Sequence, residues 1–175
     1  MRIANLLLTV AAAASLSGCS TLVSLHPFVT DQQAVIDPTL LGVWAKANGD
    51  DLYIVRQDGS HYTIRHVDKS DSRTFSAQLL KVGDVRILDL VSTNDDPFQL
   101  AVHTPMRVWV DGATLRFATL DSDWLQENAH KQLAIQEAGE RSLITAPGDT
   151  LLRFLIAYGT ADNAYGKPEV LEKQQ

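Results

Sequence analysis

Three short turns limit what this chain can fold into more than any other feature of its sequence. Asp58-Gly59 and Asp111-Gly112 each separate two segments in which apolar and polar residues alternate, and Gly83-Asp84 separates a third such pair. Turns of this kind join neighbouring antiparallel strands, because Gly and Asp tolerate the positive φ angles that tight hairpins need. The sequence therefore predicts consecutive antiparallel strands, a β-meander.

The predicted fold class is mainly β, an antiparallel meander of about eight or nine strands with two short helices. The clearest strands are expected at 52–57, 60–67, 74–82, 85–91, 113–119, 132–138 and 141–145, and the helices at about 121–130 and 147–159. A meander of this length is expected to close into a barrel, because closure removes the exposed edges of the sheet. The strand at 85–91 is apolar on both faces, which suits a barrel interior on one side and a helix on the other.

The first 18 residues have the layout of an export signal. Arg2 precedes an apolar run at 6–14, which is much shorter than the roughly 20 residues that a membrane-spanning helix needs. Leu16-Ser17-Gly18-Cys19 follows this run and resembles the lipobox of bacterial lipoproteins. The alternative is an ordinary secreted protein with a chance cysteine near its cleavage site.

The lipobox resemblance implies cleavage before Cys19 and attachment of lipid to that residue, which is the only cysteine of the chain. Two or more acyl chains hold a protein stably on a membrane, whereas one chain gives only reversible binding. Ser20 stands where an Asp would favour the inner membrane, so the resemblance implies a cell-envelope protein at the periplasmic face of the outer membrane, if the organism has one.

Removal of residues 1–18 from the 175 would leave 157, the size of one domain. We expect a lipidated tether at 19–36, a single β-barrel domain at 37–166 and a polar tail at 167–175. Asp37-Pro38 predicts a short helix, because an acid at the N-cap precedes a proline at the first helical position.

The net charge of −6 would become −7 once Arg2 is removed, and the chain has no run of basic residues. An acidic surface without a basic patch disfavours phosphate backbones, so nucleic acid is excluded as a partner. Membrane contact is attributed to the lipid anchor alone.

Gly42-Val43-Trp44 stands at the start of the first predicted barrel strand. A Gly-x-Trp tripeptide after a short helical turn, before an antiparallel barrel with a late helix, resembles the lipocalins over roughly residues 37–159. The resemblance implies a barrel that Trp44 closes at one end and, by analogy, an apolar ligand inside. The chain departs from that family by lacking a clear Thr-Asp-Tyr type turn and by placing a helix before its last strands. Residues 123–147 also resemble a group of uncharacterised bacterial exported proteins, which implies no activity.

The titratable residues predict no catalytic site, metal site or cofactor, so we expect a protein that is not an enzyme. His61 and His66 are five residues apart on one predicted strand and therefore point to opposite faces. Asp50-Asp51 and Asp95-Asp96 fall in predicted turns, where Asp bonds its own backbone. The chain also has no glycine-flanked nucleophile elbow and no phosphate-binding loop.

Arg107 and Trp109 share one face of a predicted strand and are the candidates for ligand contact, although an arginine stem on an aromatic ring is also ordinary packing. Two functions stay open. One is a membrane-anchored, non-enzymatic binding module whose barrel holds an apolar ligand such as a fatty acid or lipid. The other is a solid-cored barrel that serves as a protein-interaction or envelope-assembly module. The large interior residues point to such a filled core, but the binding module stays level with it or narrowly ahead.

Overall fold

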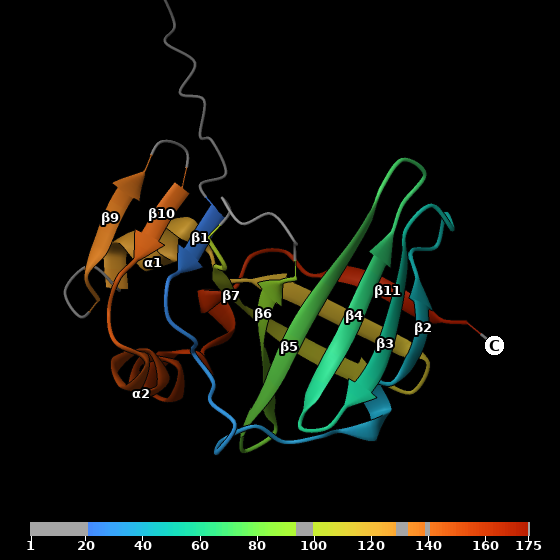
Figure 1. The fold of residues 1–175 in the computed structure, drawn as a ribbon, viewed down its shortest axis with the longest axis horizontal. Helices are drawn as coiled ribbons and strands as arrows, with labels where there is room; N and C mark the ends of the chain where they lie inside the picture. Colours follow the sequence, from blue (N-terminus) through green and yellow to red (C-terminus); the bar gives the residue numbers. More distant parts are fainter. Residues whose placement is uncertain (1–20, 94–99, 129–132, 139–140, 175) are drawn as a thin grey trace, which may run out of the picture.

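A closed barrel of eight antiparallel strands forms the body of the protein, in a computed structural model that describes residues 21–93, 100–128, 133–138 and 141–174 (Figure 1). The barrel strands are β2 (Gly42–Ala45), β3 (Leu52–Asp58), β4 (His61–Val67), β5 (Ser72–Val82), β6 (Val85–Ser92), β7 (His103–Asp111), β8 (Thr114–Thr119) and β11 (Glu169–Lys173). Consecutive strands pair from β2 to β8, and β11 completes the barrel by pairing with both β8 and β2. The prediction of a mainly β chain with a closed antiparallel barrel is confirmed.

The three predicted turns are the β3–β4, β5–β6 and β7–β8 hairpins. The two turns predicted at Asp-Gly begin one residue later in the structure than the sequence predicts. Asp58 pairs with His61 and Asp111 with Thr114, so that each Asp ends its strand and Gly is the first of the two turn residues. Gly59 has φ of 60° and Gly112 has φ of 58°, a region that residues with a Cβ rarely enter. Because successive hairpins alternate between the two ends of a barrel, these three lie at the same end.

Most of the remaining elements lie together beside the barrel (Figure 1). They are β1 (Thr21–Ser24), β9 (Ile135–Ala138), β10 (Arg141–Ile144), α1 (Ser122–Asn128), α2 (Gly148–Tyr158) and the short 3₁₀ helix η2 (Asp162–Ala164). A second short 3₁₀ helix, η1 (Pro38–Leu40), lies instead at one end of the barrel, with Leu40 in the inner core. β1 pairs in parallel with β10 and touches the start of β7 through Ser24 and His103. Both predicted helices are confirmed, although residues 129–132 lie outside the described chain.

Two separate hydrophobic cores explain why β6 is apolar on both faces. Leu88 and Leu90 face the inner core, which fills much of the barrel. Ile87 faces the outer core, where the barrel wall meets α2 through Phe154 and Leu155. The expectation that the outer face of this strand lies against a helix is therefore confirmed.

The two ends of the chain differ from the sequence-based division into tether, barrel and tail. Residues 169–173 are not a polar tail, because they form β11, the strand that closes the barrel. Only Leu171 is buried in this strand, so its sequence looks polar. Residues 21–36 are likewise more than a tether, since they contain β1 and bury Phe28 and Val29 in the outer core. The short helix expected at Asp37-Pro38 is confirmed as η1, with the Asp37 side chain accepting a hydrogen bond from the Thr39 N–H.

Candidate ligand-binding cavity

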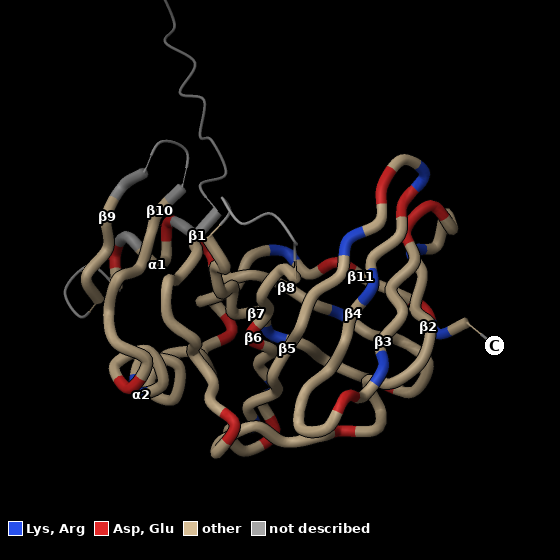
Figure 2. Tube along the Cα trace, viewed as in Figure 1, with Lys and Arg blue, Asp and Glu red and all other residues tan. Residues whose placement is uncertain are grey.

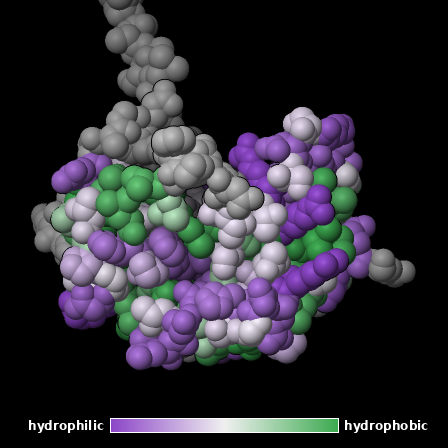
Figure 3. All heavy atoms as spheres, in the orientation of Figure 1, coloured by the Kyte–Doolittle hydropathy of each residue, from purple (hydrophilic) through white to green (hydrophobic). Residues whose placement is uncertain are grey.

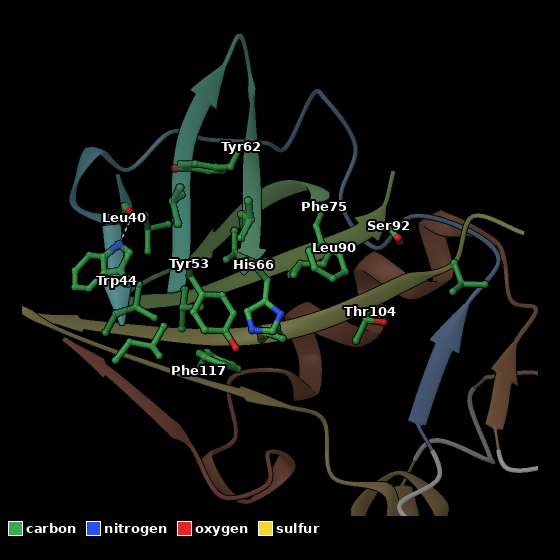
Figure 4. A pocket seen from close by; sticks show the side chains of 18 residues that line it. Leu40, Trp44, Tyr53, Tyr62, His66, Phe75, Leu90, Ser92, Thr104 and Phe117 are labelled. Atoms are coloured by element: carbon green, nitrogen blue, oxygen red, sulfur yellow. Dashed lines mark hydrogen bonds between the residues drawn. The ribbon is translucent and has the colours of Figure 1, made fainter. Parts of the chain in front are cut away.

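The barrel encloses a cavity of about 350 Å³, lined mainly by apolar side chains (Figure 4). Each strand of the barrel contributes inward-facing residues to it, because side chains alternate between the two faces of a strand. The interior side chains are large, as the sequence indicates, but they do not fill the barrel. The volume falls within the range of small-molecule sites, at its lower end.

One end of the cavity is sealed by buried residues. Its walls there include Leu40, Trp44, Tyr62, Val108, Leu115 and Leu171. The Trp44 indole Nε1 donates a hydrogen bond of 2.9 Å to the Leu40 carbonyl, which ties η1 across this end. Trp44 thus helps to close this end of the barrel.

Tyr62 closes the same end through its hydroxyl. The Asp37 backbone N–H donates to that hydroxyl at 2.6 Å, and the hydroxyl lies 3.3 Å from the Asp37 carbonyl. Burial raises the pKa of the Tyr62 hydroxyl, so the group stays neutral. These hydrogen bonds therefore fix the segment before η1 to the sealed end of the barrel.

Among the described residues, the other end of the cavity is open, because the side chains that line it are only partly buried. They include Tyr53, His66, Phe75, Ser92, Val102 and Thr104. Five of the labelled side chains gather at this end in Figure 4: His66, Phe75, Leu90, Ser92 and Thr104. A ligand would therefore meet apolar walls inside and hydroxyl and imidazole groups at the opening.

A network of charged side chains borders the open end. Lys46 Nζ lies 2.8 Å from Glu169 and 2.9 Å from Asp51, and Asp51 lies 3.0 Å from His66 Nε2. These contacts connect β11, the β2–β3 hairpin and β4, next to the place where β11 pairs with β2 and closes the barrel. Hydrogen bonds from Lys46 and His66 hold the pKa of Asp51 below its usual value.

The imidazole of His66 also stacks on Tyr53, with ring centroids 4.5 Å apart and an interplanar angle of 21°. His61 lies on the opposite face of the same strand, where its Nε2 is 3.2 Å from Asp31. The prediction that the two histidines face opposite ways is confirmed, and one of them contributes to the cavity wall.

Side-chain atoms of Asp51, His66 and Asp68 lie within 4.8 Å of one another, which is close enough to share a cation. Both carboxylates already have partners, however. Backbone and hydroxyl hydrogen bonds from Ser70 hold the pKa of Asp68 below its usual value, and Asp51 pairs with Lys46. We therefore assign no metal to this group.

Arg107 and Trp109 lie on the outside of the barrel, so the structure does not bring them to the cavity. The Arg107 guanidinium stacks over Trp109 at 4.8 Å and over Tyr165 at 5.6 Å from the ring centroids. It also pairs with Asp162 at 2.9 Å. The sequence left open whether Arg107 contacts a ligand or packs on an aromatic ring, and these contacts are such packing. They join η2 to the barrel wall.

Asp89 is a buried acid on the outer wall that the sequence did not single out. Its Oδ2 accepts hydrogen bonds from the backbone N–H groups of Phe28 at 2.8 Å and Val29 at 3.3 Å. His103 Nδ1 lies 3.1 Å from the same oxygen. The carboxylate thus holds the segment that follows β1 against β6 and β7.

The sequence left open whether the barrel is hollow, and it missed the charged network at the open end, because both features depend on contacts between distant residues. The alternation of apolar residues did predict which side chains face inward. Asp51 and His66 meet only through the pairing of β3 with β4, which sets Tyr53 opposite His66.

Cys19, Asp95-Asp96 and His130 lie outside the described residues. Within the described part of the chain, no helix combines the length and the apolar character needed to cross a membrane. Comparison with known proteins found no matching family model, no matching curated protein and no matching solved structure.

Proposed function

We propose that this chain is an exported lipoprotein, held on a membrane by lipid on Cys19, whose barrel binds one small apolar ligand and catalyses no reaction. The observation that carries the proposal is the cavity of about 350 Å³, which is apolar inside and open at one end. Burial of the ligand's apolar surface would supply the driving force, and the polar groups at the opening would fix its orientation.

The size of the cavity limits the ligand. At about 30 Å³ per non-hydrogen atom, close to the share of one water molecule in the liquid, 350 Å³ holds on the order of ten atoms. An acyl chain of medium length fits this space, and a longer chain would extend through the open end. Fatty acids and lipid tails are therefore the ligand class that the cavity favours.

The role we infer is sequestration or transfer of such a molecule at the surface of the cell envelope, in the manner of a lipocalin. Because residue 20 is Ser and not Asp, the lipobox resemblance favours location of the protein at the periplasmic face of an outer membrane. The lipid anchor would keep the barrel beside the source or destination of its ligand.

The second candidate is an envelope-assembly module, and the observation in its favour is the free edge of β9. Among the described residues this strand pairs only with β10, so its other edge can receive a strand from a partner protein.

Titration of the folded domain, residues 21–175, with a fluorescent fatty acid distinguishes the two roles. Ligand binding predicts saturable 1:1 uptake that unlabelled fatty acids of about ten carbons compete away. Val108→Phe places a ring in the cavity and should weaken uptake, because the ring takes part of the space for the ligand, whereas Val170→Phe, on the exposed outer side of β11, should leave uptake unchanged. Equal uptake by both variants, or none by the wild type, would contradict the proposal.

A further inference from the structure

We propose that the open end of the barrel faces the bilayer that holds the lipid anchor, so that ligand moves between membrane and cavity without entering bulk water. The inference rests on the proposed function for the anchor and the cavity. It adds the orientation of the barrel and the surface that contacts the membrane.

Only a short length of chain separates the anchor from the cavity. Cys19 lies five residues before Ser24, which pairs with His103 at the start of β7. Five residues span at most about 18 Å even when fully extended. Val102 and Thr104, on either side of His103, line the open end of the cavity. Lipid attached to Cys19 would therefore be held within about 18 Å of Ser24, beside the opening.

The sealed end lies far from the anchor. β7 runs from His103, beside β1, to Asp111 at the sealed end, and its 9 residues are about 30 Å long at 3.3 Å per residue. Lys173, at the end of β11, donates its N–H to the Ala113 carbonyl in the β7–β8 hairpin, which belongs to the sealed end. Figure 1 shows β1 and the end of β11 on opposite sides of the barrel. The two chain ends thus mark opposite ends of the barrel.

The surface near the opening has the chemistry of a neutral membrane contact. Leu100 is 75 % exposed, more than any other large apolar side chain in the described residues, and lies two residues before Val102. Figure 2 shows acidic and basic residues interspersed on the β2–β3 and β4–β5 hairpins, and Figure 3 shows that region as hydrophilic. Mixed charges give no net attraction to anionic lipids, so the anchor and apolar contact would hold this face on zwitterionic headgroups.

The orientation is tested with the full lipidated protein in phosphatidylcholine vesicles that contain a nitroxide-labelled lipid. A fluorophore is attached to Leu100→Cys near the opening or to Ser60→Cys in the β3–β4 hairpin at the sealed end. Both positions are exposed, and lipid occupies the native Cys19 thiol, so each introduced cysteine is the one thiol that can react. The bilayer nitroxide should quench the label at position 100 several-fold more than the label at position 60.

The outcomes separate the orientation from the anchor. Quenching by aqueous iodide should show the reverse order, with position 60 more accessible, and circular dichroism should show that both variants are folded. Equal quenching, or stronger bilayer quenching at position 60, in protein that floats with the vesicles would overturn the orientation and leave the proposed function in place. Lipidated protein that does not float with the vesicles would overturn the anchor and this inference with it.

Discussion

Replacing Asp89 by alanine should release the segment after β1 from the barrel wall and lower the stability of the whole domain. The side chain of Asp89 is 1 % exposed, and its Oδ2 is the acceptor for the backbone N–H groups of Phe28 and Val29. Alanine removes this acceptor and leaves two buried N–H groups without a partner.

Each buried donor left unpaired costs about 1–3 kcal/mol, so the two together predict a loss of about 2–6 kcal/mol in the free energy of unfolding. Asp89→Asn keeps an oxygen acceptor of the same shape and should lose less. Urea unfolding of residues 21–175, monitored by tryptophan fluorescence, measures the free energy of unfolding of both variants.

Asp84→Ala is the matched control, because Asp84 is an exposed acid in the adjacent β5–β6 hairpin. Substitutions at such surface positions usually change stability by less than about 0.5 kcal/mol. A loss below about 1 kcal/mol for Asp89→Ala, or one equal to that of the control, would refute the reasoning that this carboxylate fixes the N-terminal segment.

Three further predictions concern the cavity, the outer wall and pH. Val108→Phe should change the free energy of unfolding by less than about 1 kcal/mol in urea titrations, because the cavity can take the ring, whereas a filled core would lose about 1–3 kcal/mol. Arg107→Ala should lose about 1–2 kcal/mol through its contacts with two aromatic rings and leave fatty-acid affinity unchanged in the fluorescence titration, since Arg107 lies outside the barrel. Burial opposes ionisation of Asp37, but hydrogen bonds from Thr39 and Arg86 outweigh it and hold its pKa well below the usual 3.8. Its ionised form therefore stabilises the fold above about pH 4, and this contribution is lost as the pH falls further. The stability difference between wild type and Asp37→Asn should shrink as the pH falls below 4, and a difference that does not vary with pH would contradict this account.

The strands and turns of the barrel were predictable because their signals are local. Gly59 and Gly112 mark hairpins since the turn needs a positive φ at one residue, and alternation of apolar residues identifies the inward side of each strand. β11 gave no such signal, because it buries only Leu171 and depends on pairing with β2 and β8. A strand of this kind is specified by the barrel that it closes.

The cavity was not predictable from the identities of its residues. Large side chains such as Leu88 and Phe117 suggest a filled core, but the space between them depends on the number and tilt of the strands. The acid that fixes the N-terminal segment, Asp89, looks like an ordinary polar residue of a strand until Phe28 and Val29 are brought to it from about 60 residues away.

Native mass spectrometry of the mature protein, released from its own envelope by mild detergent, tests ligand binding most directly. A ligand-binding barrel should carry a reproducible added mass beyond that of the lipid anchor, equal to one small apolar molecule. This mass should disappear after organic extraction, return when fatty acid is added, and be less abundant in Val108→Phe. A protein that carries no such mass and takes up neither fatty acids nor phospholipids would contradict the claim that the barrel is a ligand-binding site.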